Sequence, residues 1–318
     1  MTSKEPAPFG YIHKLKNGKV AKFDNKLKDV LNSIVYNINN DWDFVIIITG
    51  NGMVRTGKSV LGLNVGAWLA DQLGTDFDVK NNICFDSQIM IDNAQKAPKH
   101  SVFVYDEARE GLATSKRFSV LQQDLVDFFN ECGQLNHIFI LILPDFFELQ
   151  RDLATHRSEF LLNVYRQEYN TEKYLTRRDA EFDIKRPLTK FNRGYFEFYS
   201  RKRKQILYFE GKKNCRIYNP RLAVFRGKYG NNYPIDEAEY KKKKKDMLER
   251  FKDRHKKAEE ENKNRDRDNY IRLRKSEGAT VKQIEDELGR YFKKGLKKTQ
   301  IYDILATGPD SVPDSVQP

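Results

Sequence analysis

The chain has few cysteines and no long apolar run, and both shortages restrict what the protein can be. Cys84, Cys132 and Cys215 are the only cysteines among 318 residues, and they show neither an even count nor metal-ligand spacing. We therefore expect reduced thiols in a reducing compartment. No apolar stretch approaches the roughly 20 residues that a membrane-spanning helix needs, and the N-terminus lacks the apolar core of a signal peptide. These absences favour a cytoplasmic protein.

Acidic residues are in the minority, and the basic surplus is concentrated near the C-terminus. Lys and Arg total 57 against 45 Asp and Glu, which gives a net charge of +12. Residues 241–300 alone hold 22 basic and 12 acidic side chains. A concentrated basic segment favours a polyanionic partner, with nucleic acid first and an anionic membrane surface second. A solvated charged helix without such a partner is the alternative.

Apolar segments alternate with helical patterns through the first half of the chain. Continuous apolar runs predict buried parallel strands at 44–49, 83–85, 102–105, 137–143 and 160–165. Apolar residues at helical spacing predict helices at 24–39, 58–73, 87–97, 117–134 and 145–154. Strands alternating with helices indicate an α/β fold with a parallel sheet that is covered on both faces.

The character of the sequence changes after about residue 170. Two alternating aromatic segments, 195–199 and 205–209, flank four basic residues and predict a β-hairpin with positive charges near its tip. The charged residues are Arg201, Lys202, Arg203 and Lys204. From Tyr240 to about Asp268 almost every side chain is charged, which predicts a solvated helix or a flexible linker.

Residues 52–59 fit the phosphate-binding pattern G-x-x-x-x-G-K-S/T and lie between a predicted buried strand and a predicted helix. Glycines let backbone N–H groups face phosphates, and the helix N-terminus adds partial positive charge. Lys58 would reach the β- and γ-phosphates, and the Ser59 hydroxyl would bind Mg²⁺. The predicted nucleotide-binding residues are Gly52, Met53, Val54, Arg55, Thr56, Gly57, Lys58, Ser59 and Val60. A glycine-rich turn without a ligand is the alternative.

Two adjacent carboxylates follow the predicted strand at 102–105. Asp106 would hold Mg²⁺ through its water shell, and Glu107 is placed to polarise the attacking water. The start of an ordinary loop is the alternative interpretation. About 50 residues separate these acids from the P-loop, which leaves room for one intervening strand.

These two motifs resemble the P-loop ATPase division that carries a catalytic glutamate beside the Walker B aspartate and an extra strand between the motifs. RecA-like ATPases, the FtsK–HerA DNA pumps, AAA+ proteins and the Zot-like phage assembly ATPases belong to this division. The resemblance covers residues 43–166, and the run at 105–109 and the Arg157 region favour the FtsK–HerA and Zot-like branch. It implies a RecA-like core, ATP with Mg²⁺, and a homo-oligomeric ring.

Two features of the division are less clearly represented here. The resemblance makes Arg157, with Arg151 as a second candidate, a catalytic arginine finger that acts on a neighbouring subunit's nucleotide; ordinary surface or salt-bridged arginines are the alternative. The division also places a polar sensor after the strand that follows Walker B. Here that strand ends at Leu143 and is followed by Pro144 and Asp145, so either Asp145 substitutes or the sensing is done elsewhere.

A compact periodic segment follows at residues 270–305. Its apolar set suffices for a three-helix unit: Ile271, Val281, Ile284, Leu288, Ile301, Ile304 and Leu305. Thr280 fits a helix N-cap and Gly289 a helix stop. The pattern is similar to resolvase-type helix-turn-helix domains, and this resemblance makes Lys297, Lys298, Thr299, Gln300 and Tyr302 the DNA-facing residues. A protein-interaction domain and a helical hairpin without a partner are the alternatives.

The sequence therefore predicts five parts. They are an extension with a helix at 1–42, an ATPase domain with a basic hairpin at 43–230, a charged helix or linker at 231–268, a helix-turn-helix-like domain at 269–306, and a disordered tail at 307–318. The favoured function is an ATP-driven DNA-handling motor of a mobile element. An ATP-switched replication initiator or helicase loader, and a Zot-like virion assembly ATPase, are the alternatives.

Overall fold

A computed structural model describes residues 10–51, 55–106, 127–129, 131–173, 182–183, 185–291 and 296–306. The chain divides into two compact units, residues 1–244 and 245–318. The first unit contains the sheet and both predicted nucleotide motifs, and the second contains most of the basic segment. Each unit is described by itself.

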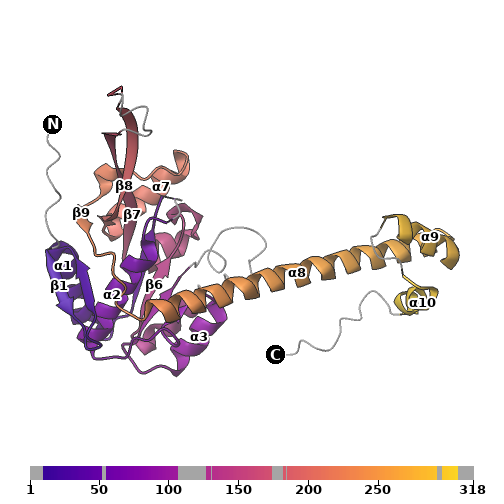
Figure 1. The fold of residues 1–318 in the computed structure, drawn as a ribbon. Helices are drawn as coiled ribbons and strands as arrows, with labels where there is room; N and C mark the ends of the chain where they lie inside the picture. Colours follow the sequence, from indigo (N-terminus) through magenta and orange to yellow (C-terminus); the bar gives the residue numbers. More distant parts are fainter. Residues whose placement is uncertain are drawn as a thin grey trace. The chain divides into compact units, whose positions relative to one another are not determined.

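Seven of the strands in the described residues form one mixed sheet in the first unit (Figure 1). Across the sheet the order is β4 (Ile83–Cys84), β5 (Val102–Tyr105), β6 (Ile138–Ile142), β3 (Phe44–Thr49), β7 (Phe160–Lys173), β8 (Arg186–Tyr199) and β9 (Phe225–Lys228). Neighbours from β4 to β7 pair in parallel, whereas β8 pairs antiparallel with both β7 and β9. The α/β class expected from the sequence is confirmed, and the sheet expected to be parallel is so from β4 to β7 but not at β8 and β9.

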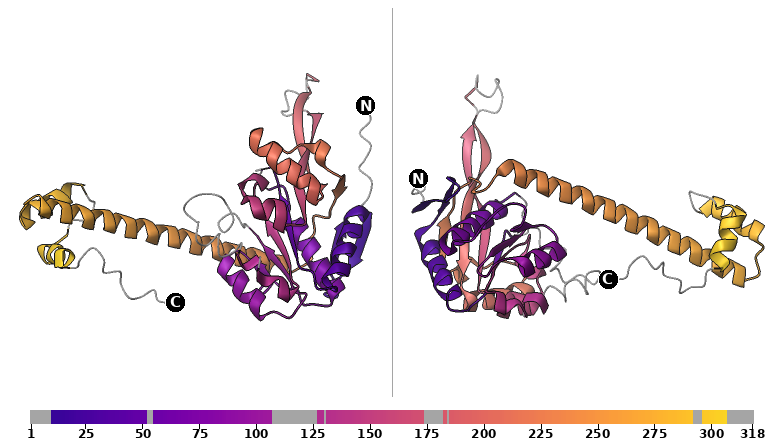
Figure 2. Two further views of the ribbon diagram at one scale, coloured as in Figure 1. Left: turned by 180° about the vertical axis from the view of Figure 1, so that it is seen from behind. Right: turned by 90° about the horizontal axis from the view of Figure 1, so that it is seen from below.

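Both faces of this sheet are covered by helices (Figure 2). On one face α2 (Lys58–Leu73) packs so closely that a Cβ on Gly62 would lie 2.6 Å from Cδ1 of Ile142. On the other face Val45 and Ile47 share a buried cluster with residues of α3 (Ser87–Lys96) and α7 (Arg201–Lys213). Burial on both faces explains why the strands are continuously apolar rather than alternating.

The N-terminal residues pack on the same unit. β1 (Tyr11–Lys14) and β2 (Val20–Phe23) form a two-stranded antiparallel sheet that the sequence analysis did not predict. Phe23 packs edge-on against Trp68 of α2, with ring centroids 5.8 Å apart. α1 (Asn25–Ile38) follows, and the Asp24 carboxylate caps it by accepting from the N–H of Lys26.

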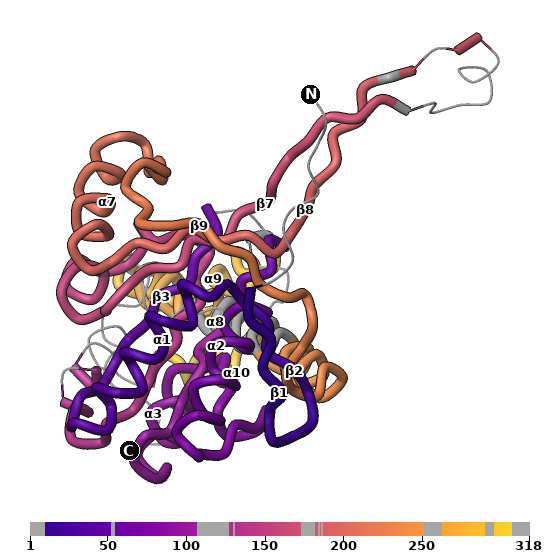
Figure 3. Tube along the Cα trace, turned by 90° about the vertical axis from the view of Figure 1, so that its left-hand side faces the viewer, coloured from indigo at the N-terminus to yellow at the C-terminus, as the bar shows by residue number. Residues whose placement is uncertain are grey.

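The predicted basic hairpin is wrong, because its two halves belong to different elements. Residues 195–199 end β8, which pairs with β7 in a long ribbon that extends beyond the rest of the sheet (Figure 3). Residues 205–209 lie in α7, where Lys204, Leu207, Tyr208 and Gly211 form a buried helical face. Their spacing of three and four residues is helical, and the aromatic alternation was assigned to the wrong period.

Two helices predicted in the first unit also differ from the structure. The segment at 145–154 forms not one helix but a 3-10 turn, η3 (Phe146–Glu148), and a short π-helical turn, η4 (Leu153–Arg157). Most of the helix predicted at 117–134 lies outside the described residues. Its described end is helical at 127–129 and closes in a 3-10 turn, η2 (Cys132–Leu135).

The charged segment is helical, in agreement with one of the two sequence alternatives. α8 (Glu237–Ser276) is 40 residues long, begins in the first unit and continues into the second. α9 (Val281–Tyr291) and α10 (Lys298–Ala306) follow in the second unit. Gly289 lies inside α9, so its assignment as a helix stop is wrong; a Cβ there would have nothing within 4 Å. An open helix surface tolerates glycine at a modest cost in stability.

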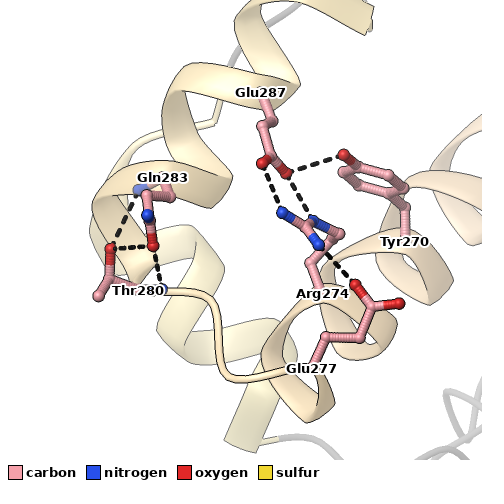
Figure 4. Close-up of polar contacts among 6 residues, drawn as sticks. All are labelled: Tyr270, Arg274, Glu277, Thr280, Gln283 and Glu287. Atoms are coloured by element: carbon pink, nitrogen blue, oxygen red, sulfur yellow. Dashed lines mark hydrogen bonds and ion pairs between the residues drawn. The ribbon is translucent and has the colours of Figure 1, made fainter.

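The second unit has the small core that the sequence predicts. Ile271, Val281, Ile284, Leu288 and Ile301 are buried together, and Ile304 and Leu305 pack against them. Figure 4 shows the polar contacts beside this core, in which Arg274 of α8 binds Glu287 of α9 through two nitrogens at 2.8 and 2.7 Å. Thr280 and Gln283 form reciprocal contacts at the start of α9, which confirms the predicted cap.

Candidate nucleotide-binding site

The P-loop motif lies at the carboxyl end of the central strand β3, where the chain turns into α2. Gly57 occupies the N-cap position of α2 with φ of +100°, a conformation that glycine adopts without strain. A Cβ at this position would also lie 2.4 Å from the Tyr229 hydroxyl oxygen. Two constraints therefore favour glycine at position 57: the positive φ angle, and the lack of space for a Cβ beside Tyr229. Gly52, Met53 and Val54 lie outside the described residues.

The remaining P-loop residues surround the start of α2. Arg55 is exposed and has φ of +58°, whereas Thr56 is buried. Lys58 Nζ lies near the end of β3, 3.1 Å from where a Cβ on Gly50 would be. Ser59 and Val60 occupy the first turn of α2 and are partly buried. The lysine and the serine hydroxyl are thus at the helix N-terminus, where an anion is favoured.

The hydroxyl of Thr56 is a buried polar atom that has no hydrogen-bond partner among the described residues. Burying such a group without a partner costs about 1–3 kcal/mol. An oxygen-rich anion at the P-loop would supply that partner. This atom therefore fits a phosphate ligand, and it is an observation independent of the sequence pattern.

The two halves of the predicted site meet. Asp106 follows β5, is 1% exposed, and accepts a hydrogen bond at Oδ1 from the hydroxyl of Ser59, with an oxygen–oxygen distance of 3.1 Å. A hydroxyl and a carboxylate at this separation are hard oxygen ligands of the kind that Mg²⁺ selects, with phosphate oxygens and water completing its shell. Glu107 lies outside the described residues.

Two residues that the sequence analysis did not select also reach Asp106. Tyr240 and Lys244, one turn apart in α8, contact its second oxygen, Oδ2. Burial and the nearby Asp106 charge both raise the pKa of Tyr240, so its hydroxyl stays protonated and donates to the carboxylate. The charged run at 241–245 gave no indication of this contact, since it was interpreted as solvated surface.

Asp145, at the position where the resembled division carries a sensor, contacts a buried tyrosine. Tyr218 Oη lies 3.0 Å from Oδ1 of Asp145 and 3.3 Å from Oγ1 of Thr49, the last residue of β3. Asp145 also caps η3 by accepting from the N–H of Phe147, and Arg216 lies 3.5 Å away. The Asp145 carboxylate therefore already has hydrogen-bond and ion-pair partners within its own chain. No sequence signal identified Tyr218, which is 73 residues further along the chain.

A row of polar side chains continues across the sheet from the end of β3. Thr49, Asn163, Glu197 and Arg226 are direct partners on neighbouring strands, so their side chains share one face. Asn163 and Tyr199 donate to Oε2 of the buried Glu197 at 3.2 and 2.8 Å, and Arg226 binds Oε1 at 3.1 Å. Both oxygens of the buried Glu197 carboxylate therefore accept hydrogen bonds, and Arg226 balances its charge.

The two arginine-finger candidates have partners within their own chain. Arg157 forms an ion pair with Asp43 and donates from Nε to the carbonyl of Phe129 at 2.7 Å. Asp43 precedes β3, so Arg157 lies at the opposite end of that strand from the P-loop. Arg151 stacks on the ring of Phe209 at 5.2 Å. The Arg157 contacts fit the alternative of a salt-bridged arginine, and a role on a neighbouring subunit stays a prediction.

The predicted DNA contacts fall into two groups. In α7, Lys202 and Arg203 are exposed and Arg201 is paired with Glu159 at 3.7 Å. Lys204 is wrong as a surface contact, because it is fully buried and donates to the Ala154 carbonyl at 2.7 Å. The residues predicted in the second unit are all exposed at the start of α10: Lys297, Lys298, Thr299, Gln300 and Tyr302.

The described residues contain no cluster of three or more His, Cys, Asp or Glu that would hold a metal ion by themselves. Cys84 and Cys132 are buried, and burial raises the pKa of each thiol to about 11. Within the described ranges, no helix combines the length and apolar character required to cross a membrane. The chain matches no protein-family model, no curated protein and no solved structure.

Proposed function

We propose that the first unit binds and hydrolyses a nucleoside triphosphate, with ATP as the substrate and Mg²⁺ as the cofactor. The observation that carries this proposal is the 3.1 Å contact between Ser59 and Asp106, which joins two motifs 47 residues apart in sequence. The order of strands from β4 to β7, with β6 between β3 and β5, is compatible with a RecA-like core. The Thr56 hydroxyl, buried without a hydrogen-bond partner in the described part of the chain, adds a polar group suited to an anion.

The proposal gives a separate role to the α2 N-terminus and to each of four side chains of the two motifs. The α2 N-terminus and Lys58 bind the phosphates, while Ser59 and Asp106 hold the metal. Mg²⁺ neutralises charge on the transferred phosphoryl group. Glu107 orients and polarises the attacking water, as its position directly after Asp106 suggests.

We further propose that hydrolysis serves a DNA-handling motor, assembled as a homo-oligomeric ring. The exposed Lys297, Lys298 and Tyr302 at the start of α10 support this proposal, because the N-terminal residues of a recognition helix are those that contact base edges. The small core of α8, α9 and α10 fits a helix-turn-helix-like domain.

One observation favours the second candidate, an ATP-dependent switch such as a replication initiator or helicase loader. The contact of α8 with Asp106 connects the metal-binding carboxylate to the helix that leads into the second unit. A switch uses nucleotide to change an assembly and turns over slowly, whereas a motor hydrolyses continuously on its track.

The experiment measures ATP hydrolysis with and without duplex and single-stranded DNA, for the wild type and for Lys58→Ala. Lys99→Ala, an exposed lysine outside the motif, is the matched control. We expect Lys58→Ala to abolish turnover and weaken nucleotide binding, and Lys99→Ala to behave as wild type. Normal turnover in folded Lys58→Ala would refute the P-loop assignment. DNA-stimulated turnover favours the motor, and ATP-dependent DNA binding with slow turnover favours the switch.

A further inference from the structure

The first turns of α8 place a positive charge on the carboxylate expected to hold the metal. Lys244 Nζ lies 3.2 Å from Oδ2 of Asp106, and the Tyr240 hydroxyl donates to the same oxygen. The Lys244 side chain is 27% exposed and that of Asp106 is 2% exposed. The ammonium therefore neutralises a carboxylate that is otherwise shielded from water.

This end of α8 is fixed at several points. Asp236 caps the helix by accepting from the N–H groups of Ala238 and Glu239 at 2.8 and 3.0 Å. Lys243 donates to the carbonyls of Val79 and Ile83 at 2.8 and 2.6 Å, in the segment that leads into β4. The contact of Lys244 with Asp106 is thus part of a built interface.

The ring of Tyr240 adds an apolar contact to this interface. It is 3% exposed and packs between Phe85 and Tyr233, with centroid separations of 5.8 and 5.7 Å. Its hydroxyl is thereby held toward Asp106. Tyr240 orients the carboxylate, while Lys244, at the next turn of α8, supplies the charge.

An ammonium and a divalent cation cannot both lie next to this carboxylate without strong repulsion, because the surroundings are poorly solvated. We propose that Lys244 is an internal cation that neutralises Asp106 through Oδ2 until Mg²⁺ binds with nucleotide, and that metal binding displaces it. Tyr240 remains as a positioning residue. This inference rests on the proposed nucleotide site and assigns its regulation to α8.

Displacement of Lys244 from Asp106 would also affect α8 outside the nucleotide site. Lys244 is the last residue of the first unit, and α8 continues from it into the second unit. Loss of the Lys244–Asp106 ion pair removes one of the contacts that hold the first turns of α8. Metal and nucleotide binding thereby act on the helix that carries the proposed DNA-binding unit.

The test measures binding of a fluorescent mant-labelled, non-hydrolysable ATP analogue to the full chain, first in EDTA and then across a Mg²⁺ titration. The variants are Lys244→Gln, which removes the charge, and Lys244→Arg, which keeps it. Lys241→Gln is the control, because Lys241 is on the same helix but pairs with the exposed Glu237 at 2.6 Å. Circular dichroism and thermal unfolding establish that each variant is folded.

We expect Lys244→Gln to lower the half-saturating Mg²⁺ concentration at least about threefold, the scale of a partly exposed charge interaction. Affinity in EDTA should stay at the wild-type value, and Lys244→Arg and Lys241→Gln should both resemble wild type. Weaker binding of Lys244→Gln in EDTA would overturn the proposal, because the lysine would then contact phosphate. An unchanged Mg²⁺ midpoint would also overturn it.

Failure of the proposed function gives a different result. If the wild type binds the analogue neither in EDTA nor with Mg²⁺, the nucleotide site itself is refuted, and this inference with it. If the wild type binds in a Mg²⁺-dependent manner but the Lys244→Gln midpoint equals that of wild type, only the role of Lys244 is refuted.

Discussion

The hydroxyl of Tyr218 lies 3.0 Å from the carboxylate of Asp145, at the place where the resembled P-loop division carries a polar sensor. The same hydroxyl accepts a hydrogen bond from the N–H of Phe146 at 2.7 Å. Burial and the Asp145 charge both raise the pKa of Tyr218 well above its usual value, so the hydroxyl remains a donor. Residues after β6 and before β9 are thereby joined beside the end of β3.

We expect Tyr218→Phe to destabilise the protein by about 1–3 kcal/mol, because the buried N–H of Phe146 loses its acceptor. Urea unfolding followed by fluorescence measures this change. Tyr36→Phe, which alters a side chain that is 71% exposed, is the control and should change stability little. Equal stability of the two variants would mean that the Phe146 N–H finds another acceptor when the Tyr218 hydroxyl is removed.

We expect Glu107→Gln to bind ATP with near wild-type affinity and to hydrolyse it at least about 10²-fold more slowly, because an amide cannot polarise water as a carboxylate does. Single-turnover hydrolysis and equilibrium binding separate the two effects. Glu110→Gln is the comparison, since Glu110 is the next carboxylate along the chain. If Glu107→Gln retains wild-type turnover and Glu110→Gln loses it, the base is Glu110.

The burial of Lys204 should make the free energy of unfolding depend on pH. Burial lowers its pKa from 10.5 to about 7. Between these values the unfolded chain binds more protons than the folded chain, so the free energy of unfolding rises with pH. We expect the stability of the wild type relative to Lys204→Met to increase from pH 7 to pH 10, by at most about 1.4 kcal/mol per pH unit.

Denaturant unfolding of both proteins at several pH values measures this difference, and groups common to both cancel. Lys202→Met changes an exposed neighbour and should show no such trend. A constant difference between the wild type and Lys204→Met would show that the ammonium is as well solvated in the folded chain as in the unfolded chain.

DNA affinity should depend on salt through the second unit. If Lys297 and Lys298 contact phosphates, replacing both by Gln should reduce the slope of log affinity against log salt by about 2. Lys202 and Arg203, exposed in α7, are the comparison pair. Binding to one duplex at four salt concentrations gives the three slopes. A larger reduction for the α7 pair would move the DNA contact to the first unit.

Gly289→Ala should stabilise α9 by about 0.5–1 kcal/mol, because alanine loses less backbone freedom on folding and a Cβ has open space there. Hydrogen exchange of the α9 amides measures the gain. Gly278→Ala is the opposite case, because Gly278 has φ of +90° and alanine would be strained. Slower exchange in both variants would contradict this assignment of the two glycines.

The central part of the fold was predictable because local pattern and burial agree there. The run Phe44–Thr49 is apolar at every position, and the structure buries all of it as β3. The P-loop pattern likewise predicted the start of α2 at Lys58. Asp106 and Ser59 meet because the carboxyl ends of β3 and β5, with only β6 between them, lie at one edge of the sheet, where α2 begins.

Other features depend on contacts distant in sequence. Gln205 to Phe209 is apolar and aromatic after its first residue, a composition that fits a strand as well as a helix, and only packing of Leu207 and Tyr208 against the sheet decides between the two. Tyr240 and Lys244 lie in a segment whose composition indicates solvent. Their contact with Asp106, 134 and 138 residues away, follows from where α8 begins rather than from local pattern.

The rate of local unfolding should increase along the ribbon of β7 and β8, from the end that pairs with β3 to the outer end. β7 pairs with β3 from Phe160 to Asn163, whereas from Gln167 to Lys173 its partners are on β8. A two-stranded segment is only marginally stable by itself, so its amides exchange with solvent through local openings, while those of β3 await global unfolding. Protease or deuterium applied to the native protein would therefore reach the outer ribbon long before the strand that leads into the P-loop.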